Sequence, residues 1–302
     1  MTMRDWLAAA TEPAELVVVG APLSRASISP SQAWATPAAF REALARFPTW
    51  DAATQADISR VRVIDAGDIE GDRDDVDATA AHRRLHAAVR DVAGAGDAVV
   101  AVIGGDNSLT RTAMTALMSA RPDEWGLLTL DAHHDCRPAQ AGSRNGTPVR
   151  ELIEAGLPGQ RVAQVGIHPL ANARDHAAWA ATHGVWIRTV DDVRRDGVDA
   201  VVTAALEHLA GTGVRRVYVD LDVDVVDRAS APACPASLPG GLPPGDLIAA
   251  ARLLGGIAAV DAVDLCEVDA LADVAGITVR LLAATFTAFA AGMARRLHGP
   301  TP

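Results

Sequence analysis

Aspartate and histidine side chains are concentrated between residues 131 and 135, where the chain reads Asp-Ala-His-His-Asp. Asp131, His133 and Asp135 are spaced two residues apart, and in an extended backbone such side chains point to the same side. Two carboxylates and an imidazole, with no thiolate in the motif, favour a hard or borderline divalent cation such as Mn²⁺ over a structural zinc ion. The alternative interpretation is a solvated acidic turn that follows a strand.

A second acidic segment, residues 217–227, favours the metal site. In it Asp220, Asp222 and Asp224 alternate with apolar residues, so the three carboxylates are predicted to line one face of a strand. Like charges packed together repel and raise one another's pKa, so such a row is costly without a compensating cation. Two carboxylate-bearing strand ends in one chain therefore predict a metal site shared between two strands.

The elements that must position these side chains alternate between strands and helices along the chain. Besides the aspartate segment, the predicted strands cover residues 16–19, 61–64, 98–103, 127–131, 162–167, 185–189 and 259–267. This order, without a linker or an internal repeat, predicts one α/β domain over residues 1–302, with a mostly parallel sheet covered on both faces.

Polar residues follow four of the predicted strands. They are Asn107, Asp131–Asp135, Asp222–Asp224 and Glu267. In an open α/β sheet ligands bind at the carboxyl ends of the strands, so we expect these four ends to form one site. His82 and His86 lie one turn apart on a predicted helix over 82–93, and we expect both on the surface.

Composition excludes several classes of partner. The net charge of −11 and the absence of a basic cluster argue against nucleic acid and anionic membranes. The three cysteines are widely spaced and lack zinc-type pairing, which favours reduced thiols. The N-terminus does not resemble a signal peptide, and the longest apolar stretch, 281–294, is too short to span a bilayer. We therefore expect a soluble cytoplasmic protein.

Together these segments resemble the ureohydrolase family, which comprises arginase, agmatinase, guanidino-acid hydrolases and formimidoylglutamase. Residues 131–135 match the family motif Asp-Ala-His-x-Asp, and residues 222–227 match most of Asp-x-Asp-x-x-Asp-Pro. The resemblance runs from Gly20 to Glu267 and implies a three-layer α/β/α fold and a homo-oligomer, a trimer or a hexamer. It also implies two Mn²⁺ ions, whose ligands are Asp131, His133, Asp135, Asp222 and Asp224.

Two residues depart from the family pattern. Asn107 stands where the family motif Gly-Gly-Asp-His-Ser supplies a metal-binding histidine. Because asparagine is a neutral and weaker ligand than imidazole, we expect one of the two ions to bind weakly or not at all. Asn145 stands where arginases carry a histidine that shuttles protons. His134, at the variable position of the first motif, is a candidate to replace that catalytic group.

The resemblance implies hydrolysis of an amidine or guanidine C–N bond. In this chemistry the cations generate hydroxide from water near neutral pH, and Glu267 receives the nitrogens of the substrate. Arg137 and Arg144 follow the first motif, in the region where the family receives the amino-acid end of its substrate, and arginine is suited to carboxylates. Asn145 and His168 complete the predicted substrate-binding residues.

The predicted substrate is N-formimino-L-glutamate, which would give L-glutamate and formamide. Two arginines beside an acidic site favour an anionic substrate, and the asparagine-containing motifs resemble the formimidoylglutamase branch. Two alternatives remain open at this stage. One is a hydrolase of agmatine or of a guanidino acid that releases urea, and the other is a metal-poor relative that has lost catalysis.

Overall fold

The structure is a computed structural model that describes residues 1–139 and 142–301. In this part of the chain an eight-stranded sheet forms the centre of the protein. The strands are β1 Leu16–Ala21, β4 Val63–Asp68, β5 Val99–Gly104, β6 Trp125–Leu130, β7 Val162–Ile167, β8 Trp186–Thr189, β9 Arg216–Asp222 and β10 Val260–Cys266. Their order across the sheet is β4-β1-β5-β10-β9-β6-β7-β8, and all neighbours are parallel. A separate antiparallel pair joins β2 Trp50–Asp51 to β3 Ala56–Asp57.

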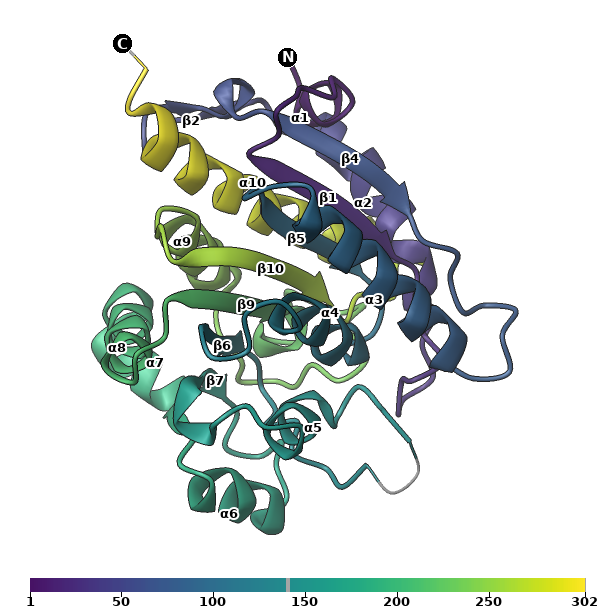
Figure 1. Ribbon diagram of the computed structural model, residues 1–302, viewed down its shortest axis with the longest axis vertical. Helices are drawn as coiled ribbons and strands as arrows, with labels where there is room; N and C mark the ends of the chain where they lie inside the picture. The colour runs from purple at the N-terminus through teal and green to yellow at the C-terminus, as the bar shows by residue number, and fades with distance from the viewer. Residues whose placement is uncertain (140–141, 302) are drawn as a thin grey trace.

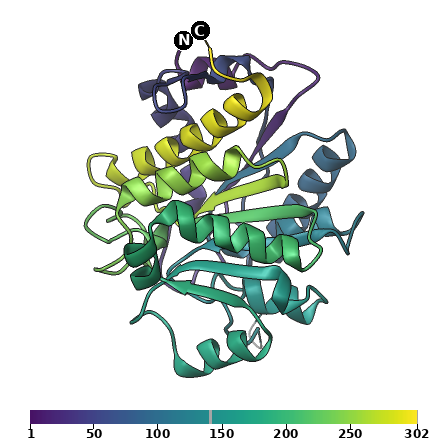
Figure 2. The same ribbon diagram turned by 90° about the vertical axis from the view of Figure 1, so that its left-hand side faces the viewer.

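Helices cover both faces of the sheet (Figure 1). They are α1 Met3–Leu7, α2 Thr36–Ala43, α3 Thr79–Gly94, α4 Ser108–Met118, α5 Pro148–Glu154, α6 Arg174–Thr182, α7 Val190–Asp196, α8 Val198–Gly211, α9 Pro244–Gly255 and α10 Ile277–His298. Figure 2 shows α8, α9 and the yellow α10 side by side in front of the sheet. The α3, α4, α5 and α6 helices pack on the other face, so the protein has the predicted three-layer α/β/α architecture.

Two apolar cores, one on each face of the sheet, hold the layers together. The central strand β9 contributes to both, because Val217, Val219 and Leu221 face the α8–α10 side whereas Tyr218 faces α3 and α4. Among the described residues one helix, α10, is long and apolar enough to cross a membrane, but 78% of its apolar window is buried inside the protein. Its closest packing partner is α9, as expected for a core helix.

The edge strand β4 lies further along the chain than predicted. It covers Val63–Asp68 rather than residues 61–64, and thus includes Asp65 and Asp68. Both carboxylates contact Arg41 of α2, whose Nε is 2.7 Å from Asp65 Oδ2 and whose Nη1 is 2.5 Å from Asp68 Oδ1. This ion-pair network allows two acidic residues in an edge strand, whereas their sequence is typical of a loop.

The predicted surface position of His82 is wrong. Its side chain is buried because α3 packs against α4, and its Nε2 lies 2.8 Å from the hydroxyl of Ser108. Burial and the nearby Arg111 lower the pKa of His82 to about 4, so the imidazole is neutral at physiological pH. His86, one turn along α3, is half-buried.

Candidate active site

The carboxyl ends of four adjacent strands, β5, β10, β9 and β6, meet at one edge of the sheet. As predicted, the polar residues that follow these strands converge there. They surround a cavity of about 360 Å³, whose lining includes His133, Asp135, Asp222, Asp224 and Glu267. Parallel strands place all their carboxyl ends on the same edge, which is why residues up to 160 positions apart, such as Asn107 and Glu267, come into contact.

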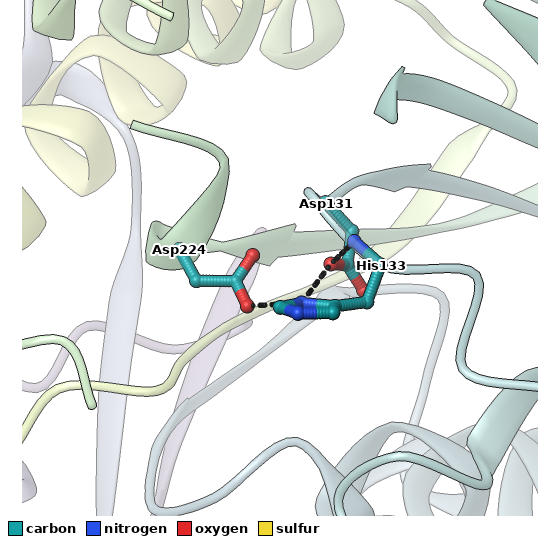
Figure 3. A group of neighbouring side chains, drawn as sticks. All are labelled: Asp131, His133 and Asp224. Atoms are coloured by element: carbon teal, nitrogen blue, oxygen red, sulfur yellow. Dashed lines mark hydrogen bonds and ion pairs between the residues drawn. The ribbon is translucent and has the colours of Figure 1, made fainter. Parts of the chain in front are cut away.

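Three side chains form the centre of the site. Asp131, His133 and Asp224 each offer one ligand atom, and these atoms lie within 4.8 Å of one another (Figure 3). His133 Nδ1 is 2.6 Å from Asp224 Oδ2 and 3.6 Å from Asp131 Oδ1. Backbone groups orient the carboxylates, since the N–H of His133 donates to Asp131 Oδ1 at 2.5 Å and the N–H of Ala132 to Asp224 Oδ1 at 3.0 Å.

Asp135 and Asp222 add two further carboxylates to the same cavity. Asp135 adopts a left-handed backbone conformation with φ of 49°, which is strained for a residue other than glycine and is often found at functional sites. Asp222 is the last residue of β9, and the strand ends here rather than continuing as predicted. A 3₁₀ turn, Val223–Val225, follows, and the N–H of Asp224 donates to Asp222 Oδ1 at 2.7 Å. The turn, not a strand face, brings Asp224 to the centre.

Burial of so many acids in one place is electrostatically unfavourable. Burial and the charge of Asp224 raise the pKa of Asp131 to about 7. Burial, together with neighbouring carboxylates, also raises the pKa of Asp135 and of Asp222 well above the usual value. Burial alone would lower the pKa of His133, but the negative charges of Asp224 and Asp131 outweigh it and raise this pKa to about 12. The cluster contains far more negative than positive charge, so a bound cation would stabilise it. Carboxylate oxygens and one imidazole nitrogen form a donor set that fits Mn²⁺.

Asn107 lies beside the acids but presents its nitrogen to them. Its Nδ2 donates to Asp135 Oδ2 at 2.8 Å, and its Oδ1 accepts a hydrogen bond from the Thr110 hydroxyl at 2.6 Å. An amide nitrogen is a hydrogen-bond donor and not a ligand of a hard cation. In this orientation Asn107 therefore supports a ligand instead of acting as the predicted ligand.

Glu267 faces the cavity from the end of β10, with a left-handed φ of 63°. Its Oε1 accepts two hydrogen bonds, from the N–H of Asn107 at 2.8 Å and from Asn145 Nδ2 at 2.9 Å. Burial, followed by the charge of Asp106, raises the pKa of Glu267 to about 8, although both donors oppose this. A cationic group in the cavity would stabilise its ionised form.

Two predicted site residues lie elsewhere. Among the residues that the structure describes, neither His134 nor His168 lines the cavity. His134 points away from His133, and its Nδ1 is 2.7 Å from Gln164 Oε1. His168 Nε2 is 3.1 Å from the carbonyl oxygen of Pro239. Both histidines hold loops in place, so the predictions of His134 as a catalytic group and of His168 as a substrate-binding group are not supported.

Both predicted substrate-binding arginines are exposed, and one of them lines the cavity as described. Arg137 lies at the rim of the cavity, whereas Arg144 lies outside its lining as described. Asn145 lines the cavity through its contact with Glu267. Sequence reasoning did not assign His176, which lines the cavity from the first turn of α6. A single histidine on an amphipathic helix has no sequence signal that would identify it.

Comparisons with known proteins show what this chain is similar to. The family model described as the arginase family matches residues 14–291. The formimidoylglutamase of Halalkalibacterium halodurans is 34% identical over 268 residues, which cover 88% of this chain and 83% of that protein. The crystal structure of Bacillus subtilis formimidoylglutamase has a TM-score of 0.91 at 28% identity, covering 97% of this chain and 92% of that one. The crystal structure of Trypanosoma cruzi formiminoglutamase with Mn²⁺ has a TM-score of 0.88 at 26% identity, covering 98% of this chain and 99% of that one.

Proposed function

The chain belongs to the arginase family, and we propose that it hydrolyses N-formimino-L-glutamate to L-glutamate and formamide. In this reaction water adds to the formimino carbon, and the bond from that carbon to the glutamate nitrogen breaks. The observation that carries the proposal is the cavity itself, which has a buried acidic floor and two basic side chains, Arg137 and His176, in its wall. The similarity to formimidoylglutamases over most of the chain supports it.

We infer that the cofactor is a pair of Mn²⁺ ions. Asp131, His133 and Asp224 would form the core of the centre, and Asp135 and Asp222 would complete it. When bound, the ions supply Lewis acidity and lower the pKa of water at the site. Because Asn107 presents its nitrogen, we expect the ion on its side to have one fewer protein ligand than the family pattern provides, and to bind more weakly.

Glu267 binds and orients the reacting group in this proposal. The formimino group is a cationic amidine, and its N–H groups pair with the carboxylate of Glu267. Asn107 and Asn145 already occupy Oε1 of Glu267, so that Oε2 is left to receive the substrate. The carboxylate thereby holds the formimino carbon over the acidic cluster, which reduces the entropic part of the barrier.

The two basic residues in the cavity wall account for the choice of an acidic substrate. Arg137 lies against Gly146, where an added Cβ would be only 2.8 Å from Arg137 Cδ, so the glycine leaves room for this side chain. A guanidinium group binds a carboxylate through two parallel hydrogen bonds. N-formimino-L-glutamate carries two carboxylates, which Arg137 and His176 can receive, whereas agmatine carries none and a simple guanidino acid carries one.

The test is a substrate panel with Mn²⁺-loaded protein. N-formimino-L-glutamate, 4-guanidinobutyrate and agmatine are incubated separately, and formamide and urea are both quantified. We expect formamide from the first compound and at most slow release of urea from the others. A flat progress curve with N-formimino-L-glutamate, beside turnover of agmatine or the guanidino acid, would refute the proposal. The same preparation shows by light scattering whether the chain forms the expected homo-oligomer.

A further inference from the structure

A buried polar cluster lies beneath the acidic floor of the cavity, on the face of the sheet covered by α4. Asp220 of β9 and Asp264 of β10 are register neighbours, and both are almost completely buried. Tyr218, the only tyrosine of the chain, is fully buried beside them, and its hydroxyl donates to Asp264 Oδ2 at 2.6 Å. None of these three residues belongs to the described lining of the cavity. The proposed reaction gives this cluster no role.

Thr110 connects this cluster to the active site. Its Oγ1 lies 2.8 Å from Asp264 Oδ2 and 2.6 Å from Asn107 Oδ1. A threonine hydroxyl carries one proton, so it can donate to only one of these oxygens. The contact with Asn107 Oδ1 is the shorter of the two, and Asp264 Oδ2 lies against the same hydroxyl, so that Thr110 is held between Asp264 and Asn107.

The orientation of the Asn107 amide follows from this arrangement. The two ends of an amide have nearly the same shape, so hydrogen-bond partners determine which end faces which neighbour. The carbonyl of Asn107 accepts from Thr110, and its Nδ2 therefore donates to Asp135 Oδ2 at 2.8 Å. The backbone N–H of the same residue holds Glu267. Asn107 thus orients one predicted metal ligand and the predicted substrate-binding carboxylate.

We propose that Thr110 and Asp264 are positioning residues of the metal centre, which fix the amide of Asn107 so that it holds Asp135 in place for a cation. Neither residue touches the substrate or the ion. Both act through Asn107, in the way that partners of metal ligands orient those ligands in other proteins. The proposal rests on the metal centre of the proposed function, but not on the identity of the substrate.

Isosteric variants of two threonines on α4 test this proposal. Thr110→Val removes the hydroxyl that contacts Asn107, and Thr110→Ser retains it. Thr112→Val is the matched control, because Thr112 is equally buried on the same helix and its Oγ1 has no hydrogen-bond partner among the described residues. Each metal-free protein is titrated with Mn²⁺, and the free ion is measured by electron paramagnetic resonance.

We expect T110V to bind one of the two ions about 10-fold more weakly than the unmodified protein, at the lower end of the ~10- to 100-fold effect of losing a direct partner of a ligand, because Thr110 acts through Asn107. T110S and T112V should bind both ions with unchanged affinity. Normal Mn²⁺ affinity in T110S would show that the hydroxyl itself positions Asn107. T112V and the thermal unfolding of the metal-free variants measure any general packing effect of the substitutions. Because the readout is metal binding, a wrong substrate would not affect it.

Unchanged affinity of T110V for both ions would overturn the proposal, as would a T110S variant as weak as T110V. If T110V does not fold, Tyr218→Phe provides the second test. This change removes only the hydroxyl that donates to Asp264. We expect a smaller loss of Mn²⁺ affinity in the same direction, and unchanged affinity in a folded Y218F protein would equally refute the role of the cluster.

Discussion

Replacing Glu267 with glutamine would remove one negative charge from the cavity while preserving the shape of the side chain. The amide oxygen of glutamine can still accept from Asn107 and Asn145, as Oε1 does now, so the local fold should persist. The amide nitrogen would then occupy the place of Oε2 and would face the N–H groups of the cationic substrate. Two donors would oppose each other where an ion pair is now expected.

The magnitude follows from the burial of this residue. Glu267 is 2% exposed, so water does not replace the lost interaction. A hydrogen bond to a charged group contributes about 1.5–3 kcal/mol, and an unpaired buried polar group costs a further ~1–3 kcal/mol. A total of about 3 kcal/mol or more corresponds to at least a ~100-fold decrease in kcat/KM, at 1.36 kcal/mol per factor of ten.

The assay is formamide release from N-formimino-L-glutamate by Mn²⁺-loaded E267Q. Glu154→Gln is the control, because Glu154 lies on the surface in an ion pair with Arg150, at 2.8 Å and far less buried. Both variants should fold and keep the Mn²⁺ content of the unmodified protein, and E267Q should melt at the same or a higher temperature because it removes a buried ionisable charge. If E267Q is properly folded and loaded but retains kcat/KM within a few-fold of the unmodified protein, Glu267 does not hold the amidine.

Three further predictions concern recognition, ionisation and packing. Arg137→Ala should raise KM for N-formimino-L-glutamate about tenfold through loss of one exposed carboxylate contact, whereas Arg144→Ala should leave it unchanged. Burial raises the pKa of Asp131 to about 7 and that of Glu267 to about 8, so the folded metal-free protein binds more protons than the unfolded chain. Its melting temperature should therefore fall as the pH rises from about 6 to about 8, and Mn²⁺ should weaken this trend; a rise with pH would contradict the assignment. Phe286→Ala, in a fully buried aromatic cluster, should lower the free energy of unfolding by about 3–5 kcal/mol in a denaturant titration, and a loss below ~1 kcal/mol would contradict its core position.

The layers of the fold could be predicted from the sequence because its strands are short apolar runs that alternate with amphipathic helices. Strand β7 is a short, mostly apolar run that is buried along its whole length and lies between Arg161 and His168, and its predicted bounds agree with the structure. The predicted strand bounds were wrong where polar residues lie inside a strand or apolar residues lie outside one. Asp65 in β4 is paired with a distant arginine, and Val223 lies in a turn although its neighbours alternate as in a strand.

The site was predictable where adjacent residues on one strand end carry the chemistry. The spacing of Asp131 and His133 indicates a common side, and the structure brings them together. The spacing cannot show what the next residue contacts, and His134 turns back toward Gln164 on the neighbouring strand. Contacts between distant segments, such as that of Asn145 with Glu267, 122 positions away, depend on loop paths that a single sequence does not reveal.

The acidic floor links the stability of this protein to its cofactor. Among the described residues, four aspartates and Glu267 converge on one cavity, with His133 as the one base inside the cluster and Arg137 and His176 only in the outer wall. Without a cation, the folded protein can relieve their repulsion only by retaining protons, which is why the pKa of several of these acids is raised. Binding of Mn²⁺ must then release protons, and the affinity should rise with pH until the acids are ionised. The ions that would activate water therefore also stabilise the ionised cluster at the sheet edge. Weak Mn²⁺ binding at the Asn107 side would then lower both the stability of the protein and its hydrolytic activity.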